Sequence, residues 1–349
     1  MKNLLKNKIV VNLLKFGLAA GILAYLVVSA YRHQKFPELL AAEKDWGLIA
    51  AAAGLFFGGV LLSFFRWQLL VRALGFPFSG QDSLRLGFLG YLFNFVAPGG
   101  VGGDLFKAVF IAREFHGRRA QAVATVFIDR VVGLYALLVV ASTVILWDGL
   151  WHTGTSAVRT ASQGTLLLTA VGALFITMML VPGITHGRVS RFLGNLPRTG
   201  RIFRQLIEAV RTYRERIGVV VAAGALSVVI HVLSVVGYYL LGRSLPGVSP
   251  TLSEHYVIVP LAMVVGAIPI TPAGLGTFEW TVDYLFRTLS SRHVDAGRGL
   301  LISLIYRLIT IAIAMIGVVV YCFCRKEVAA ALRDAEEPTP DDAPAESRQ

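Results

Sequence analysis

The sequence NFVAPGGVGGD, residues 94–104, interrupts a run of otherwise apolar residues. One proline and four glycines separate a membrane-embedded segment, 84–97, from an amphipathic segment, 105–112, and a continuous helix would avoid them. Backbone without helical hydrogen bonds lies at membrane depth only where it is buried in protein or lines a cavity. A half-helix that begins after such a break points its amide donors and positive dipole end into that cavity. The stretch therefore predicts an anion site, and the alternative is a polar loop at the membrane surface.

The remainder of the chain is apolar enough to cross a membrane several times. Of its 349 residues, 55% are hydrophobic, and several runs exceed the roughly 20 residues that span a bilayer. Full spans are expected at 9–30, 46–65, 120–147, 164–182, 217–242 and 299–324. The sequence thus predicts an all-α polytopic membrane protein with two broken or re-entrant helical segments. Its formal charge of +12 does not require nucleic acid as a partner, because the arginines cluster between spans.

The basic residues also predict the orientation. Lys2, Lys6 and Lys8 precede the first span, which places both termini of a six-span chain in the cytoplasm and the protein in the cell (inner or plasma) membrane. Arg66, just after the second span, is expected to snorkel to the cytoplasmic surface. Residues 183–216 hold eight arginines and predict an amphipathic helix, in which residues 188–216 contact anionic lipid.

A second break lies 174 residues after the first, in PITPAGLGTFE, residues 269–279. Pro98, Gly100 and Gly102 match Pro272, Gly274 and Gly276 at this single offset, and Asp104 and Glu279 follow them. A span with an arginine comes after each break, with Arg130 and Arg307 lying 32 and 35 residues beyond the respective prolines. Because the breaks are expected to enter from opposite sides, they predict inverted repeats of a transporter with a midplane site.

The domain prediction follows from this plan. A transmembrane domain covers 1–326, with repeats at about 46–147 and 217–324, a basic cytoplasmic linker at 183–216, and a disordered cytoplasmic tail at 327–349.

Charged residues inside the spans cost about 3 kcal/mol each on insertion scales, so they indicate function or pairing. Asp129 and Arg130 are adjacent and cannot face each other on a helix, so each needs another partner. Arg130 and Arg307 are expected near the midplane, where they hold a phosphate headgroup. Asp104, Asp129 and Glu279 could pair with them in an empty site or carry protons. The alternative is that all five charges form internal salt bridges. His231 is expected to be a hydrogen-bonded packing residue.

At these residues the sequence resembles the flippase-like membrane family, which has the fold of the transmembrane region of lysylphosphatidylglycerol synthases. The resemblance covers roughly residues 9–325 and rests on Asn94, Pro98-Gly99-Gly100, Gly102, Asp104, Asp129-Arg130, Pro269, Thr271-Pro272, Gly274, Gly276 and Glu279. It implies movement of a lipid between leaflets and does not specify which lipid. The synthases carry a soluble aminoacyltransferase domain after this region; here about 24 polar residues follow, so aminoacylation is not expected.

The leading functional hypothesis is a lipid flippase or transporter for a phospholipid or a lipid-linked headgroup, and the headgroup is expected to be anionic or phosphate-bearing. The candidate substrate-binding residues are Asn94, Pro98, Gly99, Gly100, Gly102, Asp104, Asp129, Arg130, Thr271, Pro272, Gly274, Gly276, Glu279 and Arg307. The alternatives are a membrane transferase with Asp104 or Asp129 as base, and a scaffold for cell-envelope lipid enzymes.

No cofactor, metal or catalytic residue is expected. Residues 99–104 lack the Lys-Ser/Thr pair of a P-loop, so ATP hydrolysis is not expected. Cys322 and Cys324 lack the further ligands of a zinc site. The direction of transport, its energy coupling and the oligomeric state stay open.

Overall fold

The computed structural model describes residues 41–96, 102–115, 118–153, 155–180, 200–268, 271 and 274–336, and the regular structure within these ranges is entirely helical. Five of the described helices are long and apolar enough to cross a membrane. They are α3 (Trp46–Ala73), α6 (Arg119–Trp147), α7 (Ser156–Leu180), α11 (Ile217–Arg243) and α14 (Arg298–Glu336). The predicted all-α polytopic membrane fold is therefore confirmed. The sixth predicted span, 9–30, lies outside the described residues.

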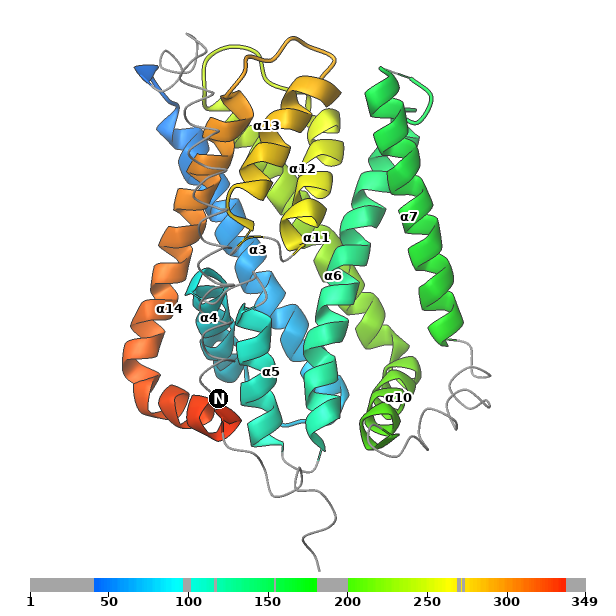
Figure 1. The fold of residues 1–349 in the computed structure, drawn as a ribbon, viewed down its shortest axis with the longest axis vertical. Helices are drawn as coiled ribbons and strands as arrows, with labels where there is room; N and C mark the ends of the chain where they lie inside the picture. The colour runs from blue at the N-terminus through cyan, green and yellow to red at the C-terminus, as the bar shows by residue number, and fades with distance from the viewer. Residues whose placement is uncertain are drawn as a thin grey trace, which may run out of the picture.

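Two helical hairpins stand at opposite ends of the bundle (Figure 1). The first pairs α4 (Gly80–Val96) with α5 (Gly102–Glu114), and the second pairs α12 (Leu252–Ala267) with α13 (Thr277–Leu289). Each predicted break falls between the two helices of one hairpin. The end of α4 and the start of α5 face the middle of the molecule from one side, and the end of α12 and the start of α13 face it from the other (Figure 1). The opposed hairpins fit the predicted plan, but an inverted relation between the complete repeats stays a prediction.

Glycine is required where the helices of the first hairpin meet. A Cβ built on Gly103 would lie 2.0 Å from the carbonyl oxygen of Gly90, far inside van der Waals contact. The amide of Gly103 donates to Oδ1 of Asn94 over 2.9 Å, which satisfies one unpaired donor at the start of α5. The pattern of glycines thus brings α4 and α5 into backbone contact, and Asn94 closes the junction.

The second hairpin depends on a helix cap and, like the first, on a close backbone contact at a glycine. Thr251 and Glu254 form a capping box that starts α12: the Glu254 amide donates to the Thr251 hydroxyl, and the Thr251 amide donates to the Glu254 carboxylate. In the break, Gly274 has φ of +66° and a Cβ there would lie 2.8 Å from the carbonyl oxygen of Gly266. This backbone conformation and this contact both exclude larger residues.

An aromatic cluster joins the second hairpin to the long helices. Phe56 of α3, Tyr238 of α11 and Tyr306 of α14 form three ring pairs with centroids 4.7–5.4 Å apart. Phe278 of α13 adds a contact with Tyr306 at 5.8 Å. Such contacts are directional and bury large apolar areas, so the cluster fixes α13 and α14 beside the centre of the bundle.

Two segments outside the bundle were singled out by sequence. A helix, α10 (Gly200–Glu215), stands where an amphipathic helix is expected, and residues 183–199 of that linker lie outside the described range. The Tyr213 hydroxyl of α10 donates to the Leu70 carbonyl oxygen over 2.9 Å, which ties α10 to α3. At the C-terminus α14 continues to Glu336, so residues 327–336 are helical where disorder is expected. Their alanine, leucine, arginine and glutamate residues favour helix intrinsically.

Candidate functional site

Two adjoining cavities, of about 290 and 470 Å³, are lined by residues at the facing ends of the two hairpins. The smaller cavity reaches toward α3, α5 and α11, and the larger one reaches toward α13 and α14. Both are lined by Tyr91, Asn94, Asp104, Arg130, Leu134, Met263 and Ala267. The shared lining places Asn94, Asp104 and Arg130 at the junction between them.

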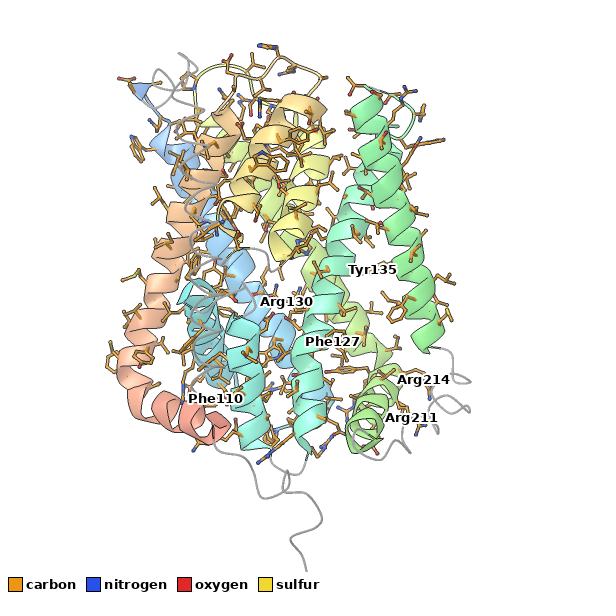
Figure 2. The ribbon with its side chains drawn as sticks, in the orientation of Figure 1. Phe110, Phe127, Arg130, Tyr135, Arg211 and Arg214 are labelled. Atoms are coloured by element: carbon orange, nitrogen blue, oxygen red, sulfur yellow. The ribbon has the colours of Figure 1, made fainter. Side chains whose placement is uncertain are left out.

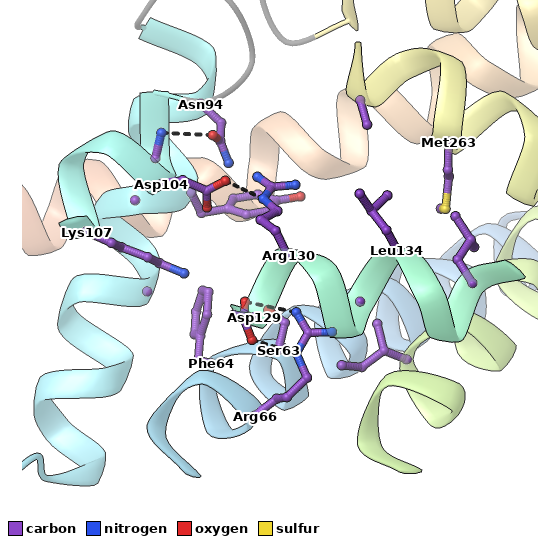
Figure 3. A pocket seen from close by; sticks show the side chains of 18 of the residues that line it. Ser63, Phe64, Arg66, Asn94, Asp104, Lys107, Asp129, Arg130, Leu134 and Met263 are labelled. Atoms are coloured by element: carbon purple, nitrogen blue, oxygen red, sulfur yellow. Dashed lines mark hydrogen bonds and ion pairs between the residues drawn. The ribbon is translucent and has the colours of Figure 1, made fainter. Parts of the chain in front are cut away.

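Arg130 pairs with Asp104 at this junction. The guanidinium Nε of Arg130, on α6, donates to Oδ2 of Asp104, on α5 (Figure 3). Asp104 occupies the first turn of its helix, where the helix dipole favours a carboxylate. The Arg130 side chain remains 44% exposed and that of Asp104 21% exposed. The pair is therefore accessible from the cavity.

A second pair, Arg66 with Asp129, is buried behind the first. The Arg66 Nε and Nη2 atoms donate to the two carboxylate oxygens of Asp129 over 2.7 and 3.0 Å, and Nη1 donates to the Ser227 hydroxyl over 2.9 Å. These contacts join α3, α6 and α11 through a bidentate bond. The expectation that Arg66 snorkels to the surface is wrong, because α3 continues to Ala73 and places Arg66 two turns inside the helix.

A third pair, Arg307 with Glu279, joins α14 to the second break. The Arg307 Nε and Nη2 atoms donate to Oε1 of Glu279 over 2.9 and 2.6 Å. The other carboxylate oxygen, Oε2, accepts the amide of Gly276 over 2.6 Å. The Glu279 side chain is fully buried and that of Arg307 is 11% exposed. Both oxygens of Glu279 are thus engaged, one by the arginine and one by the backbone of the break.

The predicted charges therefore come together as pairs around one space. Asp129 and Arg130 each have a separate partner, as the helix geometry requires. Arg130 and Arg307 both line the larger cavity, while Asp129 lines the smaller one.

The remaining predicted residues belong to the two breaks. Gly102 is buried at the start of α5, and buried Thr271 has its hydroxyl 3.2 Å from that of Thr277. Gly274, Gly276 and Glu279 form the second break beside Arg307. Pro98, Gly99, Gly100 and Pro272 lie outside the described residues. Ligand contact by any of these residues stays a prediction.

Lys107 is a cavity residue that the sequence reasoning missed. It lies on α5 three residues after Asp104 and lines the smaller cavity. Its ammonium is 4.8 Å from the ring centroid of Trp67 and 5.6 Å from that of Phe64. A lysine one turn from an intramembrane aspartate was the available signal, since residues three apart share a helix face.

His231 also lines the smaller cavity, with Nε2 at 2.9 Å from the carbonyl oxygen of Gly133. This hydrogen bond agrees with the packing role that the sequence favoured. Among the residues that the structure describes, no group of three or more His, Cys, Asp or Glu side chains is placed to bind a metal ion.

Comparison with known proteins places this arrangement in a family. The family model described as the lysylphosphatidylglycerol synthase TM region matches residues 12–317. The chain belongs to this family. The matched range contains both hairpins and the three ion pairs described above. With the long apolar helices, membership identifies a multi-pass membrane protein.

One similar curated protein carries no activity in its name. The UPF0104 membrane protein MJ1595 of Methanocaldococcus jannaschii is 22% identical over 284 residues, which cover 75% of this chain and 80% of that protein. No solved structure matches the chain.

Proposed function

We propose that this member of the family moves a lipid with an anionic or phosphate-bearing headgroup between the membrane leaflets. The observation that carries the proposal is the cavity between the two hairpin breaks, which an arginine of α6 and an arginine of α14 both line. Guanidinium groups bind phosphate with two parallel hydrogen bonds, and charge at this depth is costly without such a use or an internal partner. A headgroup that crosses the bundle would pass Arg130 and Arg307 in turn.

The arrangement of the hairpins supports transport in particular. Broken helices that enter from opposite ends and meet near the centre are typical of transporters with inverted repeats. We propose that the segments 46–147 and 217–324 are such repeats. In this scheme each hairpin closes one end of the passage, and the headgroup occupies the cavity between them.

The distribution of arginine supports an orientation with the α4–α5 end in the cytoplasm. Figure 2 shows Arg211 and Arg214 on α10 at the same end as Phe110 of α5, and Arg130 between the two hairpins. Arg113 at the end of α5 and Arg119 at the start of α6 add to the charge of this end. Basic residues are retained on the cytoplasmic side, and they would attract anionic lipid there.

Translocation can be measured directly in vesicles. The purified protein is reconstituted into liposomes that contain a fluorescent phosphatidylglycerol, and an impermeant reductant bleaches the outer leaflet. The wild type is expected to expose inner-leaflet probe to the reductant without ATP. Arg130→Gln and Arg307→Gln are expected to slow the bleaching of the inner-leaflet probe strongly. Lysine at either position should restore only part of the wild-type rate, because an ammonium lacks the bidentate fork.

Two controls separate transport from folding. Arg243→Gln removes an exposed arginine at the end of α11 and should leave translocation unchanged. The double variants Asp104→Asn/Arg130→Gln and Glu279→Gln/Arg307→Gln remove both charges of a pair, so no uncompensated charge is left to destabilise the fold.

Wild-type vesicles that bleach like protein-free vesicles would contradict the proposal and favour a scaffold. A covalently altered lipid that disappears in Asp104→Asn would favour a transferase.

A further inference from the structure

We infer that Lys107 and Arg130 together bind the phosphate of the transported lipid, and that Asp104 is a resident counter-ion which this phosphate displaces. The inference rests on the proposed function and assigns its binding site. It names the ligand as an amphiphile with a phosphate group that carries net negative charge.

The first support is the charge balance of the two cavities. Three arginines, at 66, 130 and 307, each pair with one carboxylate. Lys107 is a fourth cation, and the described residues offer it no hydrogen bond and no carboxylate salt bridge, only the two aromatic rings. One positive charge is therefore in excess in an apolar environment, which favours the binding of an anion.

The second support is the contrast between the three pairs. Asp129 and Glu279 are held by two bonds each from their arginines, and hydrogen bonds with Ser227 and Gly276 reinforce these pairs. The Asp104–Arg130 pair has one bond, and Arg130 is far more exposed than the other two arginines. No described residue accepts a hydrogen bond from the Nη atoms of Arg130. Of the three arginines, Arg130 therefore gives up the fewest hydrogen bonds when a phosphate replaces its carboxylate partner.

The third support is the position of the Lys107 ammonium. Figure 3 shows Lys107 and the Asp104–Arg130 pair directed into the same space, from α5 and α6 respectively. The rings of Trp67 and Phe64 hold the ammonium by cation–π attraction and leave its three N–H donors for a ligand. A phosphate that replaces the Asp104 carboxylate beside Arg130 would therefore meet a second cation.

The site exists in one hairpin only. Lys107 lies three residues after Asp104, and the residue three after Glu279 in the second hairpin is Val282, which is fully buried. The inferred phosphate site therefore lies at the α4–α5 side of the two cavities, and Arg307 lies on the side of α13 and α14.

Binding to the purified full-length protein tests the assignment. Short-chain phosphatidylglycerol, below its critical micelle concentration, is titrated into the protein in detergent and followed by calorimetry. Lys107→Gln is expected to weaken binding about tenfold or more, because a hydrogen bond to a charged group is lost. Lys107→Arg should bind nearly as the wild type does. Asp104→Asn should bind more tightly than the wild type, because the competing carboxylate is gone.

Further arms identify the ligand. Short-chain phosphatidylcholine, whose headgroup has no net charge, should bind more weakly than phosphatidylglycerol. Inorganic phosphate should also bind more weakly, because it lacks the apolar part; phosphate that binds as tightly as the lipid would overturn the assignment to a lipid. Arg243→Gln should bind phosphatidylglycerol as the wild type does, and thermal unfolding of each variant shows that it is folded.

The site and the function fail in different ways. If folded Lys107→Gln and Asp104→Asn both bind like the wild type while wild-type vesicles still translocate lipid, the inferred site is wrong and the function stands. If the variants follow the expected order while wild-type vesicles do not translocate, the site stands and transport is wrong.

Discussion

At the scale of single residues, the ion pairs in this bundle differ in how many hydrogen bonds hold each carboxylate. Asp129 and Glu279 accept hydrogen bonds on both oxygens, so these pairs behave as internal cross-links. Asp104 and Arg130 share one bond at the junction of two cavities. The same kind of ion pair is therefore nearly buried between helices in two places and is partly exposed at the junction of the cavities in the third.

The cross-linking role of Arg66 and Asp129 predicts a specific stability pattern. Arg66→Leu or Asp129→Leu alone leaves a buried charge without its partner, which costs about 3–5 kcal/mol. The double variant removes both charges and should be clearly more stable than either single variant. Thermal unfolding in detergent measures this order. A double variant as unstable as the sum of the two singles would show that the residues act independently.

At the scale of helices, the contacts of glycine decide how the first hairpin closes. Gly103→Ala is expected to reduce stability and translocation, because the added methyl group would overlap the Gly90 carbonyl and force α4 and α5 apart. Gly54→Ala, within α3, is the matched control, since a Cβ there meets nothing within 4 Å. It should be neutral or slightly stabilising. Equal unfolding temperatures for the two variants would contradict the close approach.

A buried arginine fixes the end of α11 in a comparable way. Arg298, at the start of α14, donates to the carbonyl oxygens of Gly242, Leu245 and Pro246 over 2.6–3.0 Å. It is fully buried. Arg298→Met should destabilise the protein by about 2 kcal/mol or more, because buried carbonyls lose charged donors. Arg243→Gln, one residue beyond Gly242 but exposed, should unfold at the wild-type temperature; a similar loss in both would assign the effect to surface charge.

At the scale of the whole molecule, the proposed transport between opposed hairpins predicts that the two ends of the bundle face different compartments. Single cysteines at Arg216 and at Val248, both exposed, test this after Cys322 and Cys324 are replaced. The position at Arg216 should react only with reagent on the cytoplasmic side, and that at Val248 only with reagent outside. Labelling of both positions from one side would contradict the proposed orientation and the inverted repeats.

The sequence by itself determined the features that depend on local chemistry. Apolar runs of sufficient length predict the long helices, and glycine and proline at 98–103 and 272–276 predict the breaks, because both effects act within a few residues. Adjacency of Asp129 and Arg130 likewise predicts separate partners. The motifs also carried the family resemblance that the match over residues 12–317 confirms.

Only the tertiary structure decided which charges meet. Arg66 bonds to Asp129 from 63 residues away and to Ser227 from 161 residues away, and no local pattern encodes such distances. Lys107 enters the site because packing of α5 against its neighbours turns it toward the cavity. An arginine at a helix end and one two turns inside look alike in sequence. Their difference arises when the bundle excludes water and each buried charge must find its partner.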